Sequence, residues 1–118
     1  MTVKNYQELI VWQKAMDLVE MIYQATKSFP KEELYGLTNQ IRRAAVSIPS
    51  NIAEGQARKS TAEFKNFPYI AQGSRAEVET QIMIARRLNY ISQVQKEMIL
   101  SLSDEIKRMA YSITSKLI

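Results

Sequence analysis

The residues of this chain most able to do chemistry are basic, and their excess over the acidic residues lies in its middle third. The sequence holds 16 Lys and Arg against 12 Asp and Glu, a net charge of +4, and residues 34–76 alone carry an excess of four positive charges. Such side chains suit phosphate oxygens and bind them without reading base sequence. A basic face that is merely hydrated is the alternative interpretation. The candidate phosphate contacts are Arg42, Arg43, Arg58, Lys59, Lys65, Arg75, Arg86 and Arg87.

Catalytic chemistry has little to work with in this sequence. The chain contains neither cysteine nor histidine, which excludes disulfides, zinc fingers, Cys or His nucleophiles and the Glu-x-x-His motif of di-iron bundles. Glu77 and Glu79 stand two residues apart, so on a helix they point about 200° from each other and cannot share a substrate. We therefore expect no enzyme activity, no catalytic residue, no metal and no cofactor.

The stretch IRRAAVSIPSNIAEGQARKS, residues 41–60, places Pro49 inside a helical pattern. At about 100° per residue its apolar side chains fall on one stripe. That stripe is formed by Ile41, Ala44, Ala45, Ile48 and Ile52. The opposite side is formed by Arg43, Ser47, Ser50, Glu54 and Arg58, with Asn51 at its edge. Pro49 removes the bond to the Ala45 carbonyl, which costs about 3 kcal/mol if unrelieved and predicts a kink.

Two interpretations of this polar side remain open. It is either a wet outer face with an ordinary Glu54–Arg58 pair, or a face on which another helix docks. Small residues such as Ser47 and Ser50 would permit a close approach, and Asn51 with Glu54 would then fix the register.

The rest of the chain shows the spacing of helices and no strand alternation. A first helix is predicted from a capping box at Asn5 and Glu8, with an apolar stripe through Leu9, Trp12, Met16, Val19 and Tyr23. The second is predicted from Thr38 to Arg58, the third from a capping box at Ser60 to Asn89, and the fourth from a box at Ser92. Short connections favour an all-α, antiparallel up-down-up-down four-helix bundle, with residues 1–118 as one domain.

Two segments are apolar almost all round their helices, LIVW at 9–12 and IMIA at 82–85. A second buried face predicts self-association. Scattered exposed apolar groups are the alternative. The first helix also carries Glu8, Lys14, Asp17 and Glu20 within its apolar pattern, so neither a signal peptide nor a membrane span is expected. Together with the absence of cysteine, this favours a cytoplasmic protein.

Several segments resemble one known family. These are QIRRAAVSIPSNIAEG at 40–55, EFKNF at 63–67, IAQGSRAEVETQ at 70–81 and RRLNYI at 86–91. They are similar to the four helix bundle proteins, also called 23S rRNA intervening-sequence proteins. NIAEG at 51–55 is the most specific part. The motif and interface candidates are Asn51, Glu54 and Gly55 within it and Pro49 just before it.

The resemblance implies a small antiparallel bundle that assembles into a pentameric barrel. Some members are encoded within large-subunit ribosomal RNA genes, and a related branch is the accessory protein of diversity-generating retroelements, which binds nucleic acid and a reverse transcriptase. We therefore expect a homo-oligomer that binds RNA or DNA, with a protein-binding adaptor or scaffold as the alternative. The chain departs from the family at Pro68, which frees the Phe64 carbonyl and should bend the third helix.

Overall fold

The computed structural model describes residues 9–57 and 67–115, and within these ranges the fold is all-α with no strand. The four α-helices are α1 (Ile10–Thr26), α2 (Leu37–Ala57), α4 (Phe67–Arg87) and α5 (Gln93–Ser115). A short 3-10 helix, η2 (Lys31–Glu33), lies between α1 and α2. The all-α prediction is confirmed, and α2 differs from its predicted bounds by one residue at each end.

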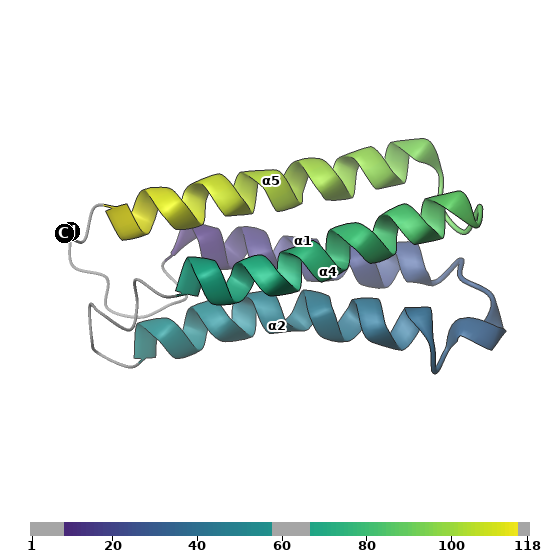
Figure 1. The fold of residues 1–118 in the computed structure, drawn as a ribbon, viewed down its shortest axis with the longest axis horizontal. Coiled ribbons are helices and arrows are strands. Elements are labelled where there is room, and N and C mark those ends of the chain that lie inside the picture. Colours follow the sequence, from purple (N-terminus) through teal and green to yellow (C-terminus); the bar gives the residue numbers. More distant parts are fainter. Residues whose placement is uncertain (1–8, 58–66, 116–118) are drawn as a thin grey trace.

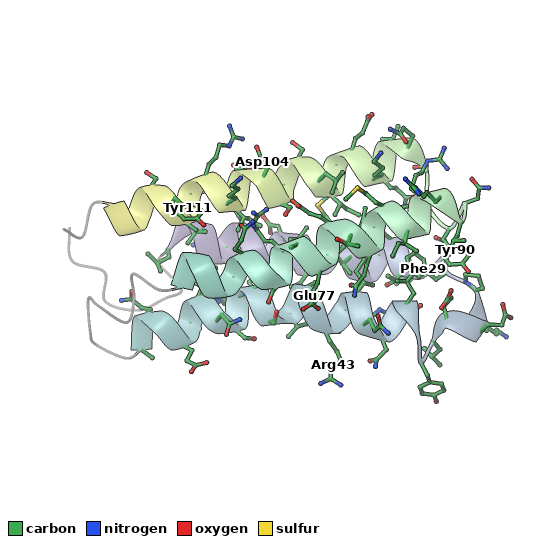
Figure 2. All side chains as sticks on the ribbon, viewed as in Figure 1. Phe29, Arg43, Glu77, Tyr90, Asp104 and Tyr111 are labelled. Atoms are coloured by element: carbon green, nitrogen blue, oxygen red, sulfur yellow. The ribbon has the colours of Figure 1, made fainter. Side chains whose placement is uncertain are left out.

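The helices lie side by side as an elongated bundle (Figure 1). α2 packs against α1 and α4, and α5 packs against α4 and α1, so each helix has two neighbours in a closed ring. The connections after α1 and after α4 meet at one end, where the Ser28 hydroxyl donates to the Tyr90 carbonyl at 2.8 Å. The Phe29 and Tyr90 rings also lie 5.3 Å apart between centroids there (Figure 2).

Two of the predicted helix boundaries have the expected chemistry. Asn89 adopts φ 62°, and the Tyr90 and Asn89 N–H groups donate to the Ala85 and Arg86 carbonyls, which closes α4 with a Schellman motif. At the start of α5, the Ser92 hydroxyl accepts from the Gln95 N–H at 3.1 Å. The Gln95 side chain in turn accepts from the Ser92 N–H at 2.9 Å. This is the predicted capping box.

The start of α1 was predicted wrongly. Leu9 occupies the N-cap position with φ −76° and ψ 124°, so the helix begins at Ile10 rather than after Asn5. No side chain caps this end. The capping boxes predicted at Asn5 with Glu8 and at Ser60 lie outside the described residues.

The core is built from aliphatic stripes, and the stripe of α2 is the one predicted. Ile41, Ala44, Ala45, Ile48 and Ile52 are all buried. On α1 the prediction was rotated, because Met16 and Tyr23 are exposed. The buried residues of that helix are Val11, Ala15, Leu18, Ile22 and Ala25. Trp12 and Val19, on the predicted stripe, pack at the margin of the core.

Pro49 is buried inside α2, and the helix continues past it to Ala57. The Ser47 hydroxyl donates to the Ala44 carbonyl at 2.7 Å, and the Ser50 hydroxyl donates to the Val46 carbonyl at 2.8 Å. These two carbonyls flank that of Ala45, whose usual partner Pro49 lacks. The bends expected at Pro49 and Pro68 stay predictions. Phe64, whose carbonyl Pro68 was expected to free, is not among the described residues.

Within residues 9–57 and 67–115, no helix is long and apolar enough to span a membrane.

Candidate nucleic-acid interface

Arg42 lies on the second turn of α2 and is held against the end of α1. Its Nε donates to the Thr26 hydroxyl at 2.9 Å, and its guanidinium carbon lies 4.6 Å from the centre of the Tyr23 ring. The Thr26 hydroxyl in turn donates to the Ile22 carbonyl at 2.8 Å. Arg42 remains half-exposed, so this arrangement fixes the direction of a cation whose outer face is still open to solvent.

Arg43 and Arg87 are the most available of the candidate cations that the structure describes. Both are exposed, and Figure 2 shows Arg43 pointing away from the bundle. Arg86 is half-exposed, and it donates to the Gln93 and Asn89 side chains at 3.2 and 3.0 Å. Arg86 and Arg87 occupy the last turn of α4, where positive charge also suits the helix dipole.

Arg75 is not a phosphate contact, which corrects the sequence prediction. Arg75 is only 3% exposed. Its Nη1 lies 3.0 Å from the Glu79 carboxylate and 3.1 Å from the Ser103 hydroxyl, while its Nη2 donates to the Gln72 side chain. A buried, fully engaged guanidinium belongs to the seam between α4 and α5 and cannot reach a nucleic acid outside the bundle.

Three further candidates, Arg58, Lys59 and Lys65, lie outside the described residues. The sequence analysis also missed two cations. Lys27 follows α1 and Lys31 begins η2, and both are exposed. They were overlooked because the sequence analysis considered the charge excess of residues 34–76, and both lysines precede that segment. Their position on either side of the Ser-Phe-Pro turn was the available signal.

The fold brings the α1–α2 cations together. Lys27 adjoins Thr26 and Arg43 adjoins Arg42 in the sequence, so the hydrogen bond between Thr26 and Arg42 places these two cations on adjoining turns at the end of α1 and in α2. Lys31 lies in the connection between them. We call Lys27, Lys31, Arg42 and Arg43 the basic end. Arg86 and Arg87 belong to the same end of the bundle, because the Tyr90 hydroxyl just after them donates to Glu33 at 2.9 Å.

The motif candidates divide between core and surface. Pro49 and Gly55 are buried, Asn51 is half-buried and Glu54 is exposed. Close helix packing at this seam is seen one turn earlier, where the Ser47 and Ser74 hydroxyls share a hydrogen bond between α2 and α4. Among the described residues, no group of three or more His, Cys, Asp or Glu side chains could hold a metal ion.

Comparison with protein families identifies this bundle. A family model described as 23S rRNA-intervening sequence protein matches residues 7–112. The chain belongs to this family. Among curated proteins, none matches the chain. The match to the 23S rRNA-intervening sequence family spans all four described helices almost completely, and it includes the NIAEG segment and every candidate cation.

Proposed function

We propose that this protein is a non-enzymatic, homo-oligomeric bundle that binds RNA or DNA through phosphate contacts, without reading bases. The observation that carries this proposal is the basic end, in which the exposed cations Lys27 and Arg43 adjoin the hydrogen-bonded pair Thr26 and Arg42, with Lys31 in the connection between the two helices. The proposed arrangement of the helices is antiparallel up-down-up-down. The ring of helix contacts and the meeting of the α1–α2 and α4–α5 connections support it.

Self-association would raise the affinity of this modestly charged protein for a polyanion. A single copy carries only +4, and exposed charges contribute little one at a time. In a pentamer, the assembly implied by the family resemblance, the formal charge would be +20 and the basic end would occur five times. Repeated contacts to one polyanion raise the effective affinity without any new type of contact.

Salt titration with matched variants tests phosphate binding. Lys31→Gln with Arg43→Gln removes two charges from the basic end, whereas Lys107→Gln with Arg108→Gln removes two exposed charges from α5. We expect the first pair to weaken binding of a single-stranded RNA at least about tenfold. It should reduce the salt slope by about 1.4 for each subunit in contact with the RNA, because each phosphate contact to a single strand contributes about 0.7. The α5 pair should change both far less. Equal effects, or binding that ignores salt, would contradict the proposal.

The alternative is an adaptor whose basic end meets an acidic protein, which stays a prediction. Pull-down from a nuclease-treated lysate separates the two functions. Partners that persist without nucleic acid favour the adaptor, whereas loss of all partners on nuclease treatment favours binding of nucleic acid. Cytoplasmic location likewise stays a prediction.

A further inference from the structure

A groove of about 420 Å³ lies along the seam between α1 and α5. Its floor is apolar and buried, made by Ala25 and Ile99. Met21 and Met98 form its sides, and the Met98 residue is 56% exposed. Methionine is flexible and packs against partners of varied shape. The groove is therefore an open apolar surface that residues 9–57 and 67–115 of a single copy leave uncovered.

The rim of this groove is acidic, although the protein as a whole is basic. Asp17 and Glu20 line it from α1, and both are exposed. The residues that line the groove include no Lys or Arg. Neither carboxylate has a hydrogen bond or ion pair within the described part of the chain. An occupant with an apolar face and a cation would complement this surface, whereas a nucleic acid would be repelled.

The outer face of α4 has the complementary chemistry. Its last two turns expose Met83 and Ile84, and Leu88, the residue directly after the helix, is also exposed. Arg87 lies among them and is exposed. From Gly73 onward, the charged residues on the exposed face of this helix are Glu77 and Arg87. Glu77 stands ten residues before Arg87, about 15 Å along the helix, so it need not enter a groove that extends about 12 Å from Asp17 to Ala25.

We propose that the outer face of α4 in one copy docks into the α1–α5 groove of the next copy. Met83, Ile84 and Leu88 would cover Met21 and Met98, and Arg87 would lie beside Asp17 and Glu20. This inference rests on the proposed self-association and assigns the two surfaces that form it. It also places Arg87 in the interface, so phosphate binding is left to the basic end.

The contact is head-to-tail, because the groove and the α4 face are different surfaces of the same chain. A dimer formed this way leaves one groove and one α4 face uncovered, so further copies add until a ring closes. A self-complementary dimer would instead use one surface twice. This difference makes the proposal testable by mixing.

The test uses two full-length variants, Met98→Arg in the groove and Ile84→Arg on α4. Both side chains are partly exposed, so each variant should keep its helical circular dichroism. By light scattering we expect the wild type to contain more than two copies. Each variant alone should be a 13.6 kDa monomer. An equimolar mixture should form a 1:1 complex of about 27 kDa, because each variant retains the surface that the other has lost.

Tyr35→Arg is the matched control, since Tyr35 is 91% exposed in the connection before α2 and lies in neither surface. It should assemble as the wild type does. A wild-type assembly that survives both Met98→Arg and Ile84→Arg would overturn the assigned surfaces while leaving self-association intact. Two monomeric variants that fail to combine would also overturn the head-to-tail contact. A monomeric wild type would instead overturn the proposed self-association itself.

Discussion

The seam between α1 and α2 and the seam between α4 and α5 each contain an arginine, in opposite environments. Arg42 lies at the edge of the first seam, half-exposed, against the Thr26 hydroxyl and the Tyr23 ring. Arg75 lies inside the second seam, 3% exposed, against Glu79 and Ser103. A cation at an edge keeps much of its hydration, whereas a buried one depends on the protein for every partner.

From this contrast we expect substitutions in the α4–α5 seam to destabilise the bundle more than substitutions in the α1–α2 seam. The Ser103 hydroxyl is fully buried, and it accepts from Arg75 and donates to Glu79 at 2.9 Å. The three side chains therefore form one closed network in which each satisfies the others. Such a network specifies the register of α4 against α5, since sliding either helix by one turn would separate Ser103 from Arg75.

Glu79→Leu should have the largest effect, because it leaves Arg75 buried without its carboxylate. We expect a loss of about 2–3 kcal/mol in the free energy of unfolding. This lies at or below the lower end of the range for broken buried pairs, because the Glu79 side chain is 30% exposed. Urea denaturation measures it. The exposed pair Asp104 and Arg108, at 3.3 Å, supplies the control. Asp104→Leu should cost under about 1 kcal/mol, and a comparable loss in both would remove the distinction between the seams.

The burial of Arg75 shows what the sequence could and could not predict. Ala71, Arg75, Val78, Ile82 and Ala85 follow helical spacing and are all buried. The helical spacing thus includes position 75, but the sequence analysis placed Arg75 among the surface cations that would contact phosphate. The partners of Arg75 are Glu79 and Gln72 on the same helix and Ser103 on α5. The contact with Ser103 depends on the register between two helices, which the sequence of either helix alone does not specify.

The other features were predicted where they depend on residues near in sequence, and were missed where they depend on contacts between helices. The caps at Asn89 and Ser92 and the stripe of α2 were predicted because each depends on residues a few positions apart. The stripe of α1 was misplaced because apolar residues surround that helix, so packing against its neighbours selects the buried row. The basic end was only partly predicted. Lys27 and Arg43 belong to it because their neighbours Thr26 and Arg42 form a hydrogen bond between α1 and α2, which the sequence does not reveal.

Ser103→Ala tests the buried network from the side of α5. The change removes one acceptor of Arg75 and one donor to Glu79 in a fully buried place. We expect a loss of about 1–2 kcal/mol, the cost of leaving buried polar groups unsatisfied. Chemical denaturation measures it. Ser101→Ala, exposed on the same helix, should be close to neutral and serves as the control. Similar values for the two serines would show that the network contributes nothing.

Thr26→Val makes the equivalent change in the α1–α2 seam. It removes the hydroxyl group that accepts a hydrogen bond from Arg42 and donates one to the Ile22 carbonyl. Arg42 is half-exposed and can turn to water, so we expect a loss of about 0.5–1 kcal/mol, near the net worth of one hydrogen bond. Thermal unfolding beside Ser103→Ala measures the difference. A larger loss for Thr26→Val than for Ser103→Ala would reverse the proposed ranking of the seams.

The smallest effect is expected at the end of the bundle, where the Tyr90 hydroxyl donates to Glu33 at 2.9 Å. This hydrogen bond, with burial and the charge of Glu33, raises the pKa of Tyr90 above its ordinary value. The folded pKa then exceeds the unfolded one, so the stabilisation is fully present below the unfolded pKa and is lost as pH rises through the folded pKa.

Tyr90→Phe should therefore lower the melting temperature slightly at neutral pH. The gap between variant and wild type should begin to close near pH 10, the ordinary pKa of tyrosine, and should be closed above the raised pKa of the folded protein. Melting curves across this range measure it. Tyr35→Phe, which lies in neither contact, should follow the wild type at every pH. A gap that stays constant with pH would mean that the Glu33 carboxylate does not act on the Tyr90 hydroxyl. The connection would then be held by the Phe29 and Tyr90 rings and by the hydrogen bond from Ser28 to the Tyr90 carbonyl.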